Sequence, residues 1–255
     1  MAVIVGIFDQ INNLLGTAFA DTIYGGQRAD TLSGAAGNDT FHGGDGADQM
    51  YGGDGNDVFL AGYGSDTVHG GAGNDIISAG NGRSTTVDKM VFYGDSGNDQ
   101  IIGGVGADKL YGGDDNDTIW GGAGRDNLFG GNGSDMLYGG NDADRLNGGA
   151  GLDFLTGGAG TDTFVFGDDD KVADFQGAGV AIGDRIDVSY IDSNVDPLVA
   201  GDIAFTFGSN AVGGVTVDNN GTETFVRIYN DADADADMVM TLSGVHVLTA
   251  DDFIL

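Results

Sequence analysis

Residues 25–42 read GGQRADTLS-GAAGNDTFH, two copies of a nine-residue block of the form G-G-x-G-x-D-x-U-x, in which U is an apolar residue. The same frame runs over residues 16–165 and holds sixteen blocks, of which only 79–93 carries extra residues, six in number. The sixth position is Asp in fifteen blocks, and the eighth position is apolar in all sixteen. A register this regular predicts a solenoid in which every block adopts the same conformation.

The chemistry of one block explains its letters. Glycine permits positive φ and has no Cβ, so the carbonyl oxygens of the first positions can turn inward. The Asp at position six adds a carboxylate to this ring of oxygens, and Ca²⁺ takes six to eight oxygen ligands at about 2.3–2.6 Å. Asp and Gly also favour ordinary tight turns, but a fixed Asp position every nine residues favours calcium.

The residues after the aspartate predict a short strand whose apolar residue faces inward. Two blocks then make one coil, with a calcium turn on each side and each ion between blocks i and i+2. The expected fold is all-β: a parallel β-roll (β-solenoid) of about eight coils over 16–165, roughly 38 Å long at about 4.8 Å per coil. We expect an N-terminal cap or docking segment over 1–15 and a C-terminal β-rich capping domain over 166–255.

The predicted ligands are the sixth-position aspartates, which should hold roughly 10–14 Ca²⁺ ions in two rows. These residues are Asp39, Asp48, Asp57, Asp66, Asp75, Asp99, Asp108, Asp117, Asp126, Asp135, Asp144, Asp153 and Asp162.

Several blocks deviate at the fourth position. Phe19 and Arg28 stand where Gly belongs in the first two blocks, so calcium sites there are doubtful. Asp115 and Asp142 occupy the same position further along, and Asp tolerates the left-handed region, so those turns should survive. The block with the insertion has Asp88 out of register, which predicts a bulged loop with a weakened or missing ion.

The composition agrees with calcium and excludes other partners. The chain has 39 Asp, one Glu, nine Lys+Arg and a formal net charge of −31, the wrong sign for binding nucleic acid. A dozen divalent ions would supply about +24 and nearly cancel this charge. The absence of Cys excludes disulfides and thiolate metal sites.

The N-terminal sequence favours neither a membrane span nor an ordinary secretory signal. The apolar run Ala2–Phe8 is far shorter than the roughly 20 residues that a span requires. It also lacks a basic segment and a cleavage site. No basic amphipathic stretch supports a role at the membrane surface.

The ninth positions place aromatic residues on both outer faces of the expected roll. One face carries Tyr51, His69, Tyr93, Tyr111 and Phe129. The other carries His42, Leu60, Ile102, Trp120 and Tyr138. Ordinary strand propensity explains these residues. The alternative is a docking face for a second copy of the chain or for sugars, because exposed apolar patches often mark interaction sites.

After Phe166 the period stops, and a segment with strand-like runs follows. The runs are Arg185–Tyr190, Ile203–Phe207, Phe225–Tyr229 and Met238–Leu242. With DTFVF at 162–166, VADF at 172–175, GDRIDVS at 183–189 and LTADDFIL at 248–255, this segment resembles the C-terminal domain of serralysin-type proteins. The whole chain resembles the repeats-in-toxin (RTX) family.

The RTX resemblance implies export by a Gram-negative type I secretion system, through an uncleaved C-terminal signal that ends in Asp251–Leu255. It therefore implies an extracellular protein, free or associated with the cell surface. Within the same segment Asp231, Asp233, Asp235 and Asp237 alternate as an acidic loop. This loop lacks the glycine and distal Glu of an EF-hand, so it is either a solvated loop or a calcium loop.

Catalysis is not expected. The zinc motif of the serralysin proteases is missing, and the only histidines are His42, His69 and His246. Three readings remain: a structural calcium-binding protein that assembles into a fibre, surface layer or matrix; the secretion and folding module of a larger enzyme, such as a serralysin-type protease or a polysaccharide-modifying enzyme; or a polysaccharide-binding or membrane-active relative. An initiating Met followed by an apolar, cap-like segment favours the first, with self-association through the ends or the aromatic faces.

Overall fold

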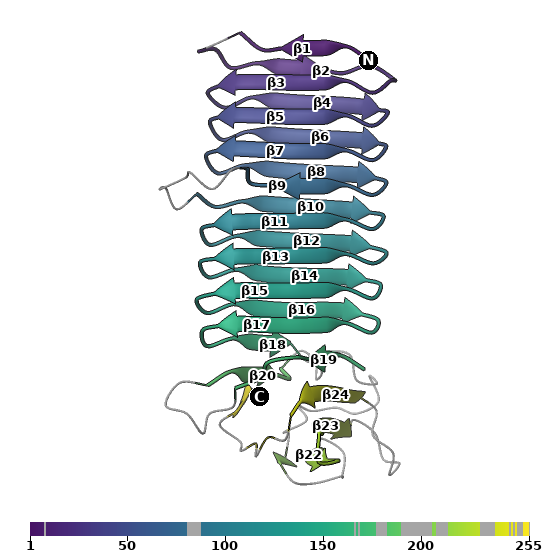
Figure 1. Ribbon diagram of the computed structural model, residues 1–255, viewed down its shortest axis with the longest axis vertical. Helices are drawn as coiled ribbons and strands as arrows, with labels where there is room; N and C mark the ends of the chain where they lie inside the picture. Colours follow the sequence, from purple (N-terminus) through teal and green to yellow (C-terminus); the bar gives the residue numbers. More distant parts are fainter. Residues whose placement is uncertain are drawn as a thin grey trace, which may run out of the picture.

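The structure is a computed structural model that describes residues 1–7, 9–80, 88–165, 167, 169–176, 183–189, 206–207, 214–229, 238–244, 246, 248 and 252–254. These residues form two long sheets that face each other along one axis (Figure 1). The chain alternates between the sheets, so consecutive strands lie on opposite sides of the roll. The predicted all-β parallel solenoid is confirmed, with about nine turns.

The strands of the repeat region divide equally between the sheets. The 14-stranded sheet contains β1 (Val3–Val5), β3 (Thr22–Gln27), β5 (Thr40–Asp45), β7 (Val58–Tyr63), β9 (Ile76–Ser78), β11 (Gln100–Val105), β13 (Thr118–Ala123), β15 (Met136–Asn141) and β17 (Phe154–Ala159). The 11-stranded sheet contains β2 (Asn13–Leu15), β4 (Thr31–Ala36), β6 (Gln49–Asp54), β8 (Thr67–Ala72), β10 (Val91–Ser96), β12 (Lys109–Asp114), β14 (Asn127–Asn132), β16 (Arg145–Ala150) and β18 (Thr163–Val165).

The register follows the nine-residue period. Equivalent positions of successive coils pair in parallel, as Ile23 with Phe41 and Phe41 with Phe59. The eighth-position residue of every block is therefore buried between the sheets and contributes to one continuous core. All of these side chains have no exposed surface, from Ile23 to Phe164. Alternation of side chains across a strand explains this, because the seventh and ninth positions must then face outward.

The turns keep their shape where glycine is replaced. Asp115 and Asp142 adopt φ of 77° and 75°, which confirms that these two turns tolerate the substitution. Arg28 takes φ of 71° at the same position of its block. The left-handed conformation is thus imposed by the coil and is not limited to glycine.

Residues 1–7 and 9–15 form one further coil at the N-terminal end. β1 and β2 pair in parallel with β3 and β4, and Ile4 and Leu14 pack against the core. This coil adds a ninth turn to the eight that the sixteen blocks make.

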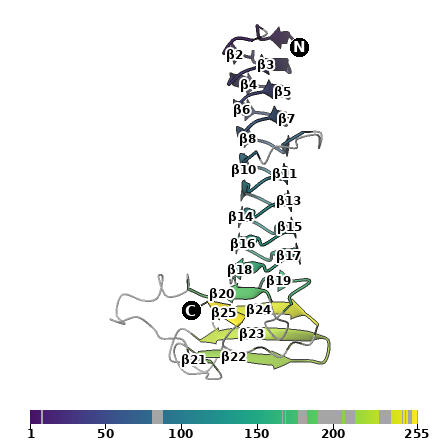
Figure 2. The same ribbon diagram turned by 90° about the vertical axis from the view of Figure 1, so that its left-hand side faces the viewer.

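The C-terminal segment continues both sheets. β19 (Lys171–Val172) and β24 (Met238–Ser243) extend the 14-stranded sheet, followed by β23 (Glu223–Tyr229), β22 (Gly214–Asn219) and β21 (Thr206–Phe207). β20 (Arg185–Asp187) and β25 (Phe253–Ile254) extend the 11-stranded sheet. Figure 2 shows the narrow roll broadening at β22, β23 and β24, where the pairing becomes antiparallel.

Each of the four strand-like runs expected after Phe166 contains an observed strand. The acidic loop from Asp231 to Asp237 lies outside the described residues. Within the described part of the chain, no helix is long and apolar enough to span a membrane.

Candidate calcium sites

The sixth-position aspartates stack in two rows, one along each edge of the roll. Row A precedes the strands of the 14-stranded sheet and contains Asp21, Asp39, Asp57, Asp75, Asp99, Asp117, Asp135 and Asp153. Row B precedes the strands of the 11-stranded sheet and contains Asp30, Asp48, Asp66, Asp108, Asp126, Asp144 and Asp162. Every ligand predicted from the sequence lies in one of these rows, and none is more than 2 % exposed.

One oxygen of each carboxylate links neighbouring coils. The Asp39 backbone N–H donates to Asp57 Oδ1 at 2.7 Å, and the Asp57 N–H donates to Asp75 Oδ1 at 2.7 Å. Row B repeats the pattern, for example from the Asp126 N–H to Asp144 Oδ1 at 2.8 Å. Each carboxylate is therefore oriented by the backbone of the preceding coil.

The second oxygen of the interior carboxylates is buried and accepts no hydrogen bond. This holds for Oδ2 of Asp30, Asp39, Asp48, Asp57, Asp66, Asp75, Asp99, Asp108, Asp117, Asp126, Asp135, Asp144, Asp153 and Asp162. Burying an ionised carboxylate without a partner is costly, and native proteins seldom do so. An unpartnered oxygen that recurs along the interior of both rows indicates a position for a cation.

Backbone carbonyl oxygens lie close to these unpartnered carboxylate oxygens. A Cβ added to Gly52, the first residue of its block, would collide with Asp57 Oδ2 and with the carbonyl oxygen of Gly70 on the next coil. Glycine leaves this space open, and carboxylate and carbonyl oxygens line it, although Ala61 and Ala79 hold the same first position in their blocks. That donor set suits Ca²⁺, a hard cation that prefers oxygen ligands.

Side chains alone do not complete a site. Across the described residues, no three His, Cys, Asp or Glu side chains gather around one point. Most ligands must therefore be backbone carbonyls, which the glycine-rich turns can direct inward. A search of the sequence for clusters of acidic side chains would miss such sites, whereas the period reveals them.

The electrostatics of the interior carboxylates oppose ionisation in the absence of a cation. Burial raises the pKa of Asp57 to about 6, and raises that of Asp126 to about 8. The N–H donated by the preceding coil lowers each pKa in part, while neighbouring carboxylates in the row raise it. A divalent ion would reverse this balance because it stabilises the charged form.

Asp21 differs from the interior aspartates of row A. Its Oδ1 accepts the Ala2 N–H at 2.6 Å, and its Oδ2 accepts the N–H and the hydroxyl of Thr17 at 2.7 and 2.8 Å. The pKa of Asp21 is lowered, mainly by the Ala2 N–H and then by the Thr17 hydroxyl. Hydrogen-bond donors of the protein thus stabilise the ionised carboxylate of Asp21, whereas the interior carboxylates require a cation for this.

The rows continue beyond the repeats that the sequence period defines. Asp170 and Asp184 accept the N–H groups of Asp153 and Asp162 on Oδ1, at 3.3 and 2.9 Å. Asp184 Oδ2 also accepts the Gln176 N–H at 2.8 Å. Both aspartates stand two residues before a buried apolar residue, a signal that remains in the sequence after the nine-residue spacing is lost.

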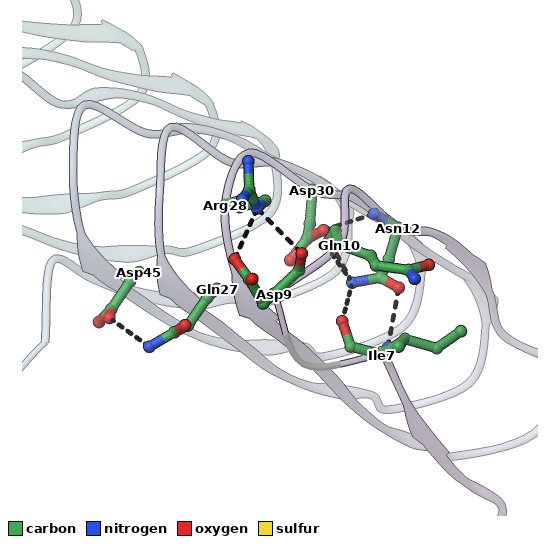
Figure 3. A network of polar contacts seen from close by, with 8 residues as sticks. All are labelled: Ile7, Asp9, Gln10, Asn12, Gln27, Arg28, Asp30 and Asp45. Atoms are coloured by element: carbon green, nitrogen blue, oxygen red, sulfur yellow. Dashed lines mark hydrogen bonds and ion pairs between the residues drawn. The ribbon is translucent and has the colours of Figure 1, made fainter.

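Asn12 begins row B at the N-terminal end, as Figure 3 shows. Its N–H donates to Asp30 Oδ1 at 2.6 Å, and its side-chain amide donates to Asp30 Oδ1 and to the Gly25 carbonyl at 3.0 and 3.1 Å. An ion pair between Arg28 and Asp9, 2.8 Å long, lies beside it (Figure 3). Asn12 stands nine residues before Asp21, at the sixth position of the frame, but the sequence analysis missed it because Asn replaces Asp and residues 7–11 contain no glycine.

The ninth-position aromatic residues stack as ladders. Tyr51, His69, Tyr93, Tyr111 and Phe129 follow one another with ring centroids 4.4–5.5 Å apart and nearly parallel planes. On the other sheet two separate pairs stack, Tyr24 with His42 and Trp120 with Tyr138. Because the rings stack on one another, a ring within the longer ladder has a neighbour on both faces.

The fold and the aspartate rows define a calcium-binding parallel β-roll. The family model of the RTX calcium-binding nonapeptide repeat matches residues 9–27, 15–50, 24–59, 51–85, 93–128, 102–137 and 138–170. Together these segments cover more than half of the chain. The chain belongs to this RTX family, and its repeats bind Ca²⁺.

Two solved structures show a weaker likeness. The AlgE6R3 subunit of the Azotobacter vinelandii mannuronan C5-epimerase is 32% identical over 59% of this chain and 80% of its own, with a TM-score of 0.29. The AlgE6R2 subunit of the same enzyme is 28% identical over 58% of this chain and 87% of its own, also with a TM-score of 0.29. TM-scores this low do not show a shared overall structure. No curated protein matches the chain.

Proposed function

We propose that this chain is a secreted, non-enzymatic calcium-binding protein that folds on calcium outside the cell and serves a structural, self-assembling role in a fibre, surface layer or matrix. The observation that carries the proposal is the pair of rows of buried, unpartnered carboxylate oxygens. A roll that must ionise these groups at neutral pH is unstable unless cations occupy the turns. Calcium is then a requirement for the fold itself.

Calcium concentration would decide where the chain folds. Extracellular calcium modules bind at roughly 10⁻⁴–10⁻³ M. At the much lower free calcium of a cytosol the chain would stay unfolded, which suits export as an extended polypeptide. The resemblance of the C-terminal sequence to serralysin-type domains supports a type I secretion signal there, with Asp252, Phe253 and Ile254 within it.

The positions of the histidines support a non-enzymatic role. His42 stacks on Tyr24 on the 14-stranded sheet, whereas His69 lies within the ladder of the 11-stranded sheet. His246 contacts the Ser243 carbonyl in the C-terminal segment at 2.7 Å. Three histidines on three separate surfaces cannot form a zinc centre, which needs clustered ligands.

The N-terminal coil offers a surface for self-association. β1 and β2 are the end strands of their sheets and each pairs on one side only among the described strands. Val3, Leu15 and Phe19 are 66–71% exposed around these edges. Each sheet has an unpaired edge at this end, and a second roll has two sheets with the same spacing between them. Another copy of the chain is therefore the favoured partner.

Charge favours the same end. Residues 1–20 contain one acidic residue, Asp9, in a chain whose formal net charge is −31. Arg28 pairs with Asp9 at 2.8 Å. Two copies can therefore approach through this end with less electrostatic repulsion than through the rest of the surface.

Light scattering during calcium addition tests the structural role. Wild type should assemble once calcium is present, and a chain that lacks residues 1–15 should fold on calcium but remain monomeric. A wild-type protein that folds on calcium and stays monomeric at high concentration would refute self-assembly.

A further inference from the structure

Row B has one break in its series of carboxylates. Met90 stands at the sixth position of the block that contains the insertion, and its side chain is buried. Its backbone keeps the register, since the Met90 N–H donates to Asp108 Oδ1 at 2.8 Å. Asp66 on the preceding coil and Asp108 on the following coil are fully buried, and each has an Oδ2 without a hydrogen-bond donor. Asp66 and Asp108 thus each require a cation, although the Met90 side chain between them has no carboxylate to bind one.

Asp88 returns to the coil two residues before Met90, at the fourth position. The Lys89 N–H donates to the Ser65 hydroxyl at 3.0 Å, which aligns the fifth positions of the two coils. The Gly64 N–H donates to Asp88 Oδ2 at 3.2 Å, so the carboxylate faces the turn that carries Asp66.

The backbone of Asp88 faces the following coil. A Cβ added to Gly106 would collide with the Asp88 carbonyl oxygen and would lie 3.3 Å from Asp108 Oδ1. The carbonyl of Asp88 and the carboxylate of Asp108 therefore border the same space. Asp88 presents an anionic oxygen to one coil and a carbonyl oxygen to the next.

We propose that Asp88 supplies the carboxylate that Met90 lacks, and that it helps hold a calcium ion in row B between the turns of Asp66 and Asp108. The backbone carbonyls of these turns complete the coordination, as at the other sites. Row B is then continuous across the inserted block. The proposal rests on calcium binding by the repeats and does not depend on the structural role proposed above.

Counting bound calcium tests the assignment, by equilibrium dialysis against calcium followed by atomic absorption. Asp88→Asn should bind one ion fewer than wild type. Asp142→Asn is the matched control, because Asp142 occupies the fourth position in the same row but Asp144 fills its sixth position. This control should bind as many ions as wild type, and the double variant Asp88→Asn/Met90→Asp should recover the lost ion.

Three results would overturn the proposal. In the first, Asp88→Asn binds the full number of ions with unchanged affinity. In the second, Asp142→Asn also loses an ion, which would show that Asp88 does not replace a sixth-position ligand. Met90→Asp alone could gain an ion, which would show that the place is vacant in wild type. If Asp88→Asn fails to fold in saturating calcium, judged by circular dichroism, Met90→Asp still decides: an unchanged ion count supports the assignment and a gain refutes it.

Discussion

Aspartates in the interior of the rows and aspartates at the ends of the rows differ in the hydrogen-bond donors that their carboxylate oxygens receive. In the interior, Asp57 keeps one buried oxygen without a donor, and burial raises its pKa to about 6. At the N-terminal end, Asp21 has donors on both oxygens and a lowered pKa. At the other end Asp184 also has a donor on each oxygen, although burial still raises its pKa.

The difference shows how the roll can end. An interior turn depends on an ion because the second oxygen of its carboxylate has no hydrogen-bond donor. A terminal turn is not stacked on a further glycine-rich block and can recruit N–H and hydroxyl donors from less regular segments, such as Thr17 and Gln176. Calcium dependence should therefore belong to the interior coils.

Proton concentration should have the largest effect, because it acts on every interior carboxylate together. Their pKa values are raised from the ordinary 3.8 to about 6 at Asp57, about 7 at Asp75 and about 8 at Asp126. A carboxyl group whose pKa is raised in the folded chain contributes to the stability of the ion-free fold. This contribution is complete below about pH 4 and is lost as pH rises through about 6–8. Chain stripped of calcium should thus show strand structure near pH 4.5 and lose it by pH 8.

Circular dichroism of the stripped chain across this range measures the effect. The calcium-loaded chain should respond in the opposite sense, because protons compete for the carboxylates, so its apparent calcium affinity should fall as pH decreases from 8 to 5. A stripped chain that is equally unfolded at pH 4.5 and pH 8 would show that carboxylate ionisation is not what opposes folding.

Removing one interior carboxylate should have the next largest effect. Asp57→Ala should lose about two ions, because the ion sites are shared with the same-row neighbours Asp39 and Asp75. It also removes the acceptor of the Asp39 N–H. Asp21→Ala should keep the wild-type ion number and lose stability only. Calcium stoichiometry by equilibrium dialysis distinguishes the two, and an unchanged count in Asp57→Ala would contradict the bridging arrangement.

A pair of glycine substitutions should produce smaller effects. Gly112→Ala places a Cβ against Asp117 Oδ2 and the Gly130 carbonyl, and should weaken calcium binding at that turn. Gly26 has φ of 117° but open space around its Cβ position. Gly26→Ala should therefore cost only backbone strain, about 1–3 kcal/mol, and keep every ion. Equal loss of calcium in both variants would mean that turn conformation, and not the oxygen-lined space, controls binding.

The smallest effect should come from the aromatic ladder. Tyr93 stacks on His69 at 4.4 Å and on Tyr111 at 4.8 Å. Tyr93→Thr should lower the free energy of unfolding by about 1–3 kcal/mol, since each aromatic pair contributes about 0.5–1.5 kcal/mol beyond its buried area. The calcium count should not change. Denaturant unfolding in saturating calcium measures the free energy of unfolding. An altered ion count would show that the aromatic ladder affects calcium binding at the turns.

The sequence predicts the interior of the roll well because each block repeats the same local rule. The period fixes which residues are buried, and places every predicted ligand from Asp39 to Asp162 in a row. It also predicts that Asp115 and Asp142 keep the left-handed turn. These features depend on neighbouring coils that are nearly identical.

The ends depend on contacts that the period does not encode. The donors to Asp21 come from Thr17 and Ala2, whose role follows only from the geometry of the first coil. Asn12 replaces the aspartate at a sixth position whose block has no glycine, so the repeat motif does not identify it. Asp184 follows a connection outside the repeat spacing, so the period alone does not place it in row B, although it stands two residues before the buried Ile186.

The central claim is that the interior carboxylates make folding depend on calcium. Far-ultraviolet circular dichroism during a calcium titration, starting from excess chelator at neutral pH, tests it most directly. We expect little strand signal in chelator and a cooperative rise to a full strand signal as free calcium enters the range of roughly 10⁻⁴–10⁻³ M. A full strand signal already present in excess chelator at neutral pH would contradict it.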